Sequence, residues 1–185
     1  MPDAPWFIDA SLFLGMHDAD SQIRQACLSF FRRCFHQQVV MNLEQVGLCD
    51  GVIWQFPQSL QSDYYPFMDC LHSEMQILRQ GYCYSELRLA LDEQLDGQLD
   101  SLSPMQGMLA AQVIHQGGRL FTHDVQLRAL PLLQGHIGHI PMLDTQSRFP
   151  DHLETLYQHS KTLVVTQKDG IYALPGHIHS LDNSP

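Results

Sequence analysis

The sequence predicts an α/β fold with a mostly parallel central sheet, and three observations lead to that class. Short apolar runs that suit buried strands alternate with longer segments of helical periodicity. Capping residues stand in front of several helical segments. Hydrophobic residues make up 44% of the 185 residues, which is an ordinary share for a globular core. Because strands that alternate with helices favour parallel pairing, we expect helices on both faces of the sheet.

The first part of the chain is expected to contain two strands and two helices. Residues 6–8 form a short apolar run that predicts a buried strand, and a turn or short helix follows over residues 10–15. Asp20 or Ser21 then caps an amphipathic helix whose apolar side chains recur at helical spacing. Residues 38–41 predict a second strand, after which Asn42 caps another helix.

The middle of the chain is expected to be mostly helical before a third strand. Residues 62–79 predict one helix, and residues 85–99 predict an exposed helix rich in Asp, Glu and Gln. Ser103, Pro104 and Gln106 form a capping box for a further helix that two glycines end at residues 117–118. Residues 119–122 then predict the third strand.

The last part of the chain carries weaker signals. Residues 139–143 predict an edge strand that contains a proline, and residues 151–159 predict a short helix. Residues 162–166 and 171–174 flank an Asp-Gly turn and predict a β-hairpin. We expect one domain over residues 1–150, with residues 151–185 packing on it as a C-terminal helix, hairpin and tail.

Charge and cysteine content limit the classes of function. The net charge is −10, with ten Lys and Arg against twenty Asp and Glu, which argues against tight nonspecific binding of nucleic acid. Bound metal ions can still supply local positive charge. The five cysteines include no C-x-x-C pair, which argues against a disulfide framework or a thiolate zinc site. No apolar run reaches the roughly 18 residues that span a bilayer, and no signal peptide is evident, so we expect no membrane association and a cytoplasmic location.

Three carboxylates follow the three predicted strands. Asp9 comes directly after the first strand, Glu44 lies just past the second, and Asp124 lies just past the third. If these strands are neighbours, the carboxylates converge at one edge of the sheet, where ligands of open α/β sheets bind. Oxygen ligands suit Mg²⁺ or Mn²⁺, and either ion can activate water to attack a phosphodiester. Each residue also has a purely structural interpretation as a helix cap or a first-turn acid.

The same stretches resemble the motifs of the PIN domain family of nucleases. Phe7-Ile8-Asp9-Ala10-Ser11 is similar to the first motif, and Asn42-Leu43-Glu44-Gln45-Val46 is similar to the second. An Ala-rich helix that leads into Leu120-Phe121-Thr122-His123-Asp124 resembles the third. The resemblance implies a three-layer α/β/α domain that cleaves RNA with Mg²⁺ or Mn²⁺ held by Asp9, Glu44 and Asp124. It also implies bacterial toxin–antitoxin or RNA-processing roles, with RNA, an antitoxin-like protein or a second copy of the chain as partners.

One departure from the family pattern opens alternatives. Gln106 stands where the family usually has a further Asp, and it has a sufficient structural role in the capping box. Ser11, Thr122 and His123 are candidate accessory residues, and His123 could contact phosphate or donate a proton. Gln106 and the negative charge favour a catalytically degenerate PIN-like binding or scaffold protein. A phosphoesterase that acts on a small substrate is the remaining alternative.

Overall fold

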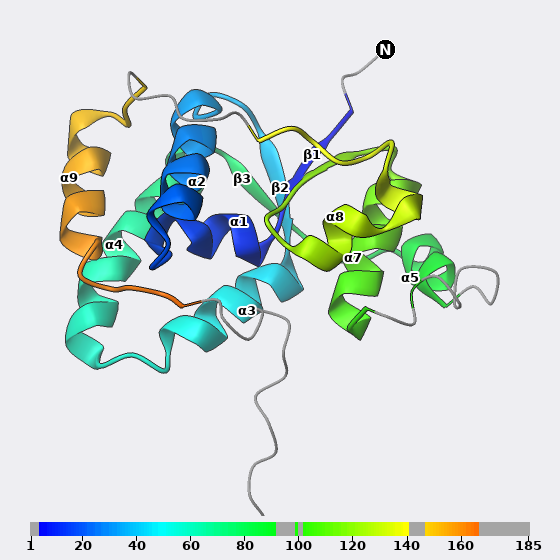
Figure 1. Cartoon of the computed structure of the whole chain (residues 1–185), viewed down its shortest axis with the longest axis horizontal. Helices are drawn as coiled ribbons and strands as arrows, with labels where there is room; N and C mark the ends of the chain where they lie inside the picture. The colour runs from blue at the N-terminus through cyan, green and yellow to red at the C-terminus, as the bar shows by residue number, and fades with distance from the viewer. Residues whose placement is uncertain (1–3, 92–98, 100–101, 141–146, 167–185) are drawn as a thin grey trace, which may run out of the picture.

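The computed structural model of the chain describes residues 4–91, 99, 102–140 and 147–166. In this part of the chain, four strands form one sheet, with β1 at Trp6–Ile8, β2 at Val39–Asn42, β3 at Ile77–Gln80 and β4 at Arg119–Phe121. Their order is β3-β2-β1-β4, and all three pairings are parallel. The predicted α/β class with a parallel sheet is therefore confirmed (Figure 1).

Helices connect the strands and pack around the sheet. The α-helices are α1 (Ala10–Leu14), α2 (Ser21–Arg33), α3 (Leu43–Ile53), α4 (Gln58–Glu74), α5 (Tyr84–Ala90), α7 (Pro104–His115), α8 (Val125–Ala129) and α9 (Asp151–Ser160), and short 3₁₀ turns occupy Gly15–His17 and Pro131–Leu133. Several begin where the sequence predicts a cap: Asp20 caps α2, Asn42 caps α3, and Ser103 with Gln106 closes a capping box on α7. None of the helices in the described ranges is long and apolar enough to cross a membrane.

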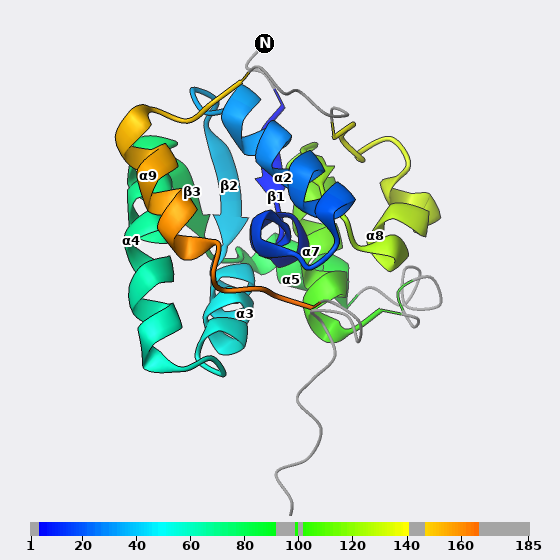
Figure 2. The ribbon, with the colours of Figure 1, turned by 60° about the vertical axis from the view of Figure 1, so that its left-hand side comes forward.

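Alternate side chains of each strand enter two different hydrophobic clusters. Phe7, Val40 and Leu120 pack with apolar residues of α7 and α8. Their chain neighbours Ile8, Met41 and Phe121 pack with residues of α1, α2, α3, α4 and α9. Because strand side chains point alternately to the two faces, these clusters lie on opposite faces of the sheet. Figure 2 shows α4 and α9 side by side on one side of the sheet, away from α7 and α8.

The structure corrects the helix predicted over residues 62–79. Helix α4 begins earlier, after Pro57, and ends at Glu74. Gln76 then takes a positive φ of 55°, which breaks the helix and turns the chain back toward the sheet. Residues 77–80 follow as β3, paired in parallel with β2. Pairing with a distant strand outweighs the helical pattern of this stretch, which is a tertiary effect that the local sequence does not show.

The predictions for the last part of the chain have mixed outcomes. Helix α9 is confirmed and packs on α4. Residues 139–140 are not in a strand; instead, Ile137 makes a single parallel bridge to Leu120. Val165 bridges in parallel to Asp18. Residues 141–146 and 167–185, including the second arm of the predicted hairpin, lie outside the described residues.

Candidate functional site

The strand order places three sequence-predicted residues at one edge of the sheet. β1 lies between β2 and β4, and all run in parallel, so their carboxyl ends meet at one edge. Asp9 follows β1 directly, Glu44 lies in the first turn of α3 after β2, and Asp124 caps α8 after β4. The three strands are therefore neighbours, which is the condition that the sequence analysis set for this site. We call this region the carboxyl edge, defined by Asp9, Glu44 and Asp124 with the residues that bond to them.

Asp9 is a fully buried carboxylate that protein donors surround. Its Oδ1 accepts hydrogen bonds from the Ser11 hydroxyl at 2.7 Å and from the backbone N–H of Leu12 at 3.0 Å. Its Oδ2 accepts from the Thr122 hydroxyl at 2.6 Å. A carboxylate with no solvent contact needs such donors, because an unpaired buried charge is costly. Asp9 therefore caps α1 and at the same time links β1 to β4.

Two hydroxyl groups extend this link to the start of α8. Thr122 Oγ1 accepts a hydrogen bond from the backbone N–H of Asp124 at 2.9 Å. Ser11 Oγ accepts from the backbone N–H of His123 at 2.9 Å. The two hydroxyl oxygens lie 3.1 Å apart. Ser11 and Thr122, which the sequence marks as accessory residues, thus fix the ends of β1 and β4 against each other.

Gln106 connects the capping box of α7 to Asp124. Its Oε1 accepts from the backbone N–H of Ser103 at 2.8 Å, as a capping box requires. Its Nε2 donates to Asp124 Oδ1 at 3.1 Å, and the same oxygen caps α8 by accepting from the backbone N–H of Leu127 at 2.8 Å. An amide donor therefore faces Asp124 at the position where the PIN resemblance puts a carboxylate.

Glu44 is held by Tyr82, which lies in the loop after the neighbouring strand β3. Its Oε2 accepts a hydrogen bond from the Tyr82 hydroxyl at 2.8 Å, and that hydroxyl accepts from Asn42 Nδ2 at 2.9 Å. Burial, and then the bond to Glu44, raise the pKa of Tyr82 well above its usual range, so Tyr82 stays a donor. Gln45 adds a further bond, since its Oε1 accepts from the backbone N–H of Ala10 at 2.9 Å. Tyr82 and Gln45 have no sequence signal, because their roles depend on how α3 and the β3–α5 loop pack.

The carboxyl edge has the right type of donor atoms for a divalent cation, but these atoms are not close enough together to share one ion. Carboxylate oxygens are the donors that Mg²⁺ and Mn²⁺ prefer. However, both oxygens of Asp9 already accept hydrogen bonds, and Asp9, Glu44 and Asp124 do not bring their oxygens within 4.8 Å of one another. In the part of the chain that the structure describes, one group meets that spacing, and it consists of Cys70, Glu74 and His152. The side chains of the edge must therefore rearrange before they can share an ion.

A pocket of about 580 Å³ adjoins the carboxyl edge. Its lining joins the end of β4 to α2, α8 and the segment that follows, and consists of Ala26, Thr122, His123, Arg128, Gln134, Ile137, Gly138, His139 and Ile140. Thr122 contributes to both the pocket wall and the Asp9 network. Burial and the nearby Arg128 lower the pKa of His123, and its Nε2 has no hydrogen-bond partner among the described residues. Arg128 is a site candidate that the sequence did not indicate, because it lies in no motif.

Comparisons with known proteins bear on family membership alone. No curated protein matches the sequence. The model of a family of unknown function, DUF6190, matches residues 1–170. Because this match covers nearly the whole chain, the protein belongs to the DUF6190 family.

Proposed function

We propose that the protein is a three-layer, PIN-like phosphodiesterase that cleaves RNA at the carboxyl edge of its sheet with Mg²⁺ or Mn²⁺. The observation that carries this proposal is the adjacency of β2, β1 and β4, which brings the segments bearing Glu44, Asp9 and Asp124 to one edge. Asp9, Glu44 and Asp124 are the residues we assign to the ion. When bound, such an ion lowers the pKa of a water molecule and stabilises charge on the phosphate.

The adjoining pocket supports a phosphate-containing substrate. Its volume of about 580 Å³ falls within the range of small-molecule sites and suits a nucleotide. Arg128 supplies a permanent positive charge on its wall, and His123 and His139 supply imidazole groups. A guanidinium group is a strong, geometrically specific partner for phosphate. Arg128 therefore gives the acidic protein a local positive charge beside the carboxylates.

The chain's own residues also predict weak cation binding. Three hydrogen bonds already occupy most of the acceptor positions of the Asp9 carboxylate, and Gln106 presents an amide N–H to Asp124. Each of these hydrogen bonds competes with a metal ion for the carboxylate oxygens of Asp9 and Asp124. We therefore expect lower affinity for Mn²⁺ than four convergent carboxylates would give.

The second candidate is a PIN-like binding or scaffold protein without catalysis. The bond from Gln106 to Asp124 favours it, as does the complete set of donors around Asp9. RNA, an antitoxin-like protein and a second copy of the chain are the partners we propose, together with a cytoplasmic location. The net charge of −10 favours a further variant, in which the substrate is a small phosphoester instead of RNA.

The deciding experiment is a calorimetric titration of Mn²⁺ into the wild type, Asp9→Asn and Asp63→Asn. Asp63 is an exposed residue of α4, so its variant controls for the loss of one negative charge. Phosphodiesterase function predicts heat of binding in the wild type and in Asp63→Asn, and none in Asp9→Asn. Equal titrations in all three folded proteins would reject the assignment of Asp9 to the ion.

A substrate panel with the same three proteins then identifies the chemistry. Single-stranded RNA, nucleotides and sugar phosphates are each incubated with and without Mn²⁺. We expect RNA cleavage that depends on Mn²⁺ and falls by about 100-fold or more in Asp9→Asn, the size of loss that a missing electrostatic group produces. Hydrolysis of the small compounds alone indicates the small-substrate variant, and no turnover of any compound favours the binding protein.

A further inference from the structure

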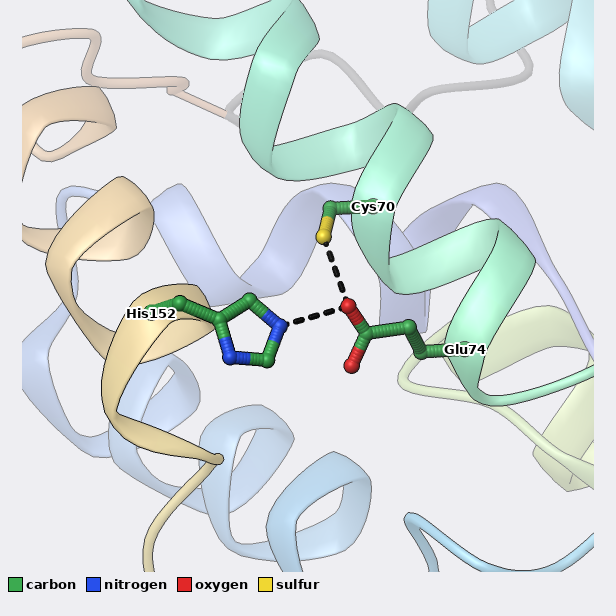
Figure 3. A group of neighbouring side chains, drawn as sticks. All are labelled: Cys70, Glu74 and His152. Carbon is green, nitrogen blue, oxygen red and sulfur yellow. Dashed lines mark hydrogen bonds and ion pairs between the residues drawn. The ribbon is translucent and has the colours of Figure 1, made fainter.

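Three potential metal ligands from two helices meet on the surface of the α4–α9 pair. Cys70 and Glu74 are four residues apart on α4, so they share one face of that helix. His152 comes from the first turn of α9, which packs against α4. Figure 3 shows the three side chains pointing toward one another across the two helices. We call this group the α4–α9 cluster.

The distances within the cluster are those of groups that can share one ion. Glu74 Oε1 accepts a hydrogen bond from the Cys70 thiol at 2.9 Å and lies 2.5 Å from His152 Nε2. The sulfur, oxygen and nitrogen atoms all lie within 4.8 Å of one another. A tetrahedral ion with bonds of about 2.0–2.3 Å separates its ligand atoms by less than that limit. Small side-chain rotations are therefore enough to close the three groups around an ion.

The ligand types select the class of metal. A thiolate, an imidazole nitrogen and a carboxylate oxygen are the donors of protein-bound Zn²⁺. Mg²⁺ and Ca²⁺ prefer oxygen donors alone, so they do not suit Cys70 and His152. Glu74 and His152 are exposed and Cys70 is half-buried, which leaves room for water as a fourth ligand.

We propose that Cys70, Glu74 and His152 bind a Zn²⁺-type transition-metal ion that links α9 to α4. The sequence argued against a thiolate zinc site because it has no C-x-x-C pair, but this site uses one cysteine and takes its histidine from a distant helix. An ion held by both helices fixes α9, near the end of the described chain, to the body of the fold. Because the ligands meet in the folded protein alone, metal binding stabilises the folded state.

The test uses Co²⁺ as a spectroscopic substitute for Zn²⁺, with the full chain under a non-thiol reductant. Wild type, Cys70→Ser, Glu74→Gln and His152→Ala are compared with two controls. Cys83→Ser changes an exposed cysteine outside the cluster, and His159→Ala changes another exposed histidine of α9. A sulfur-to-cobalt charge-transfer band is expected in the wild type, Glu74→Gln and both controls, and is expected to be absent in Cys70→Ser.

Competition with Zn²⁺ then measures affinity, and thermal unfolding measures stabilisation. We expect His152→Ala to weaken Zn²⁺ binding by about 100-fold or more and Glu74→Gln by about 10-fold or more, while both controls match the wild type. Zn²⁺ should raise the unfolding midpoint of the wild type and of Asp9→Asn alike, which separates this site from the carboxyl edge. No charge-transfer band in the wild type, or equal Zn²⁺ affinity in Cys70→Ser and Cys83→Ser, would overturn the proposal.

Discussion

The carboxyl edge and the α4–α9 cluster both bring potential metal ligands near one another, yet they differ in burial and in hydrogen bonding. Asp9 is fully buried and accepts three hydrogen bonds from Ser11, Leu12 and Thr122. In the α4–α9 cluster, Glu74 accepts its bonds from Cys70 and His152, which are themselves metal ligands by type. At the carboxyl edge, the oxygens of Asp9 already accept hydrogen bonds from neighbouring protein groups. The α4–α9 cluster instead presents a thiol, a carboxylate and an imidazole near the solvent.

This difference indicates different roles for the two regions. The carboxyl edge stabilises the fold, whereas the α4–α9 cluster is more accessible to a ligand. A buried carboxylate that holds two strands together contributes to stability, and a ligand there must compete with the protein's own hydrogen bonds. An exposed cluster contributes little to stability by itself, because surface ion pairs are screened by water. Substitutions in the first region should therefore change stability strongly, and substitutions in the second should change metal binding while leaving the metal-free protein nearly unaffected.

The largest effect is expected for Asp9→Ala. This change removes the cap of α1 and leaves two hydroxyls and a backbone N–H buried near Thr122, so we expect a loss of about 3 kcal/mol or more. Asp20→Ala is the matched control, because Asp20 also caps a helix but is exposed, and its loss should be about 1 kcal/mol. Urea unfolding measures both. Equal losses would show that Asp9 is only a cap.

The second effect concerns His17, which lies beneath the inner face of the α4–α9 pair. Its Nε2 lies 2.8 Å from Ser160 Oγ, and its ring contacts those of Tyr64, Phe67 and Tyr157. Burial, and then Arg24, lower its pKa from 6.5 to about 3. The unfolded chain therefore binds an extra proton between these values, and stability should fall as the pH falls below about 6.5, by about 2 kcal/mol at pH 5.

Denaturant unfolding at a series of pH values checks this prediction. His72 has a pKa lowered to about 4 by burial and Arg79, so it adds to the same slope in the wild type. His17→Gln should reduce the slope by about one proton between pH 6 and pH 4. His159→Gln changes an exposed histidine of α9 and is the matched control. An unchanged slope in His17→Gln would mean that His17 is protonated in the folded protein.

A smaller effect is expected for Thr122→Val, which keeps the shape of the side chain and removes its hydroxyl. The change breaks the bonds to Asp9 and to the N–H of Asp124, so we expect a loss of about 1–2 kcal/mol. Thr122→Ser keeps the hydroxyl and should lose less. Thr155→Val on the exposed face of α9 should stay within about 0.5 kcal/mol of the wild type. Equal losses in the valine and serine variants at position 122 would rule out the hydroxyl link.

The last prediction concerns Gln106→Glu, which tests the missing carboxylate. Glu also completes a capping box, but it replaces the donor to Asp124 with a negative charge. Because Gln106 is buried, we expect a loss of about 1–3 kcal/mol without metal and a larger stabilisation by Mn²⁺ than in the wild type. Gln37→Glu adds the same charge at an exposed loop position and serves as the control in thermal unfolding. No gain in Mn²⁺ response would argue that the edge is not a cation site.

Local sequence determined most of the secondary structure. The apolar runs before Asp9 and His123, the Asn42 cap and the capping box at Ser103 each specify an element through contacts within a few residues, and the structure has each of them. The helix predicted through residue 79 was wrong from residue 77, because the strand conformation of β3 depends on pairing with β2. Short-range signals are reliable where the stabilising partner is close in the chain.

The sequence by itself therefore determined the α/β class and the positions of Asp9, Glu44 and Asp124 after their strands. Tertiary structure decided that β1 lies between β2 and β4, and that Tyr82 and Gln106 hold Glu44 and Asp124. It also decided that His152 meets Cys70 and Glu74, which are far away in the sequence. The physical reason is that strand order and helix packing depend on the burial of whole faces, and no short motif records which distant side chains those faces bring together.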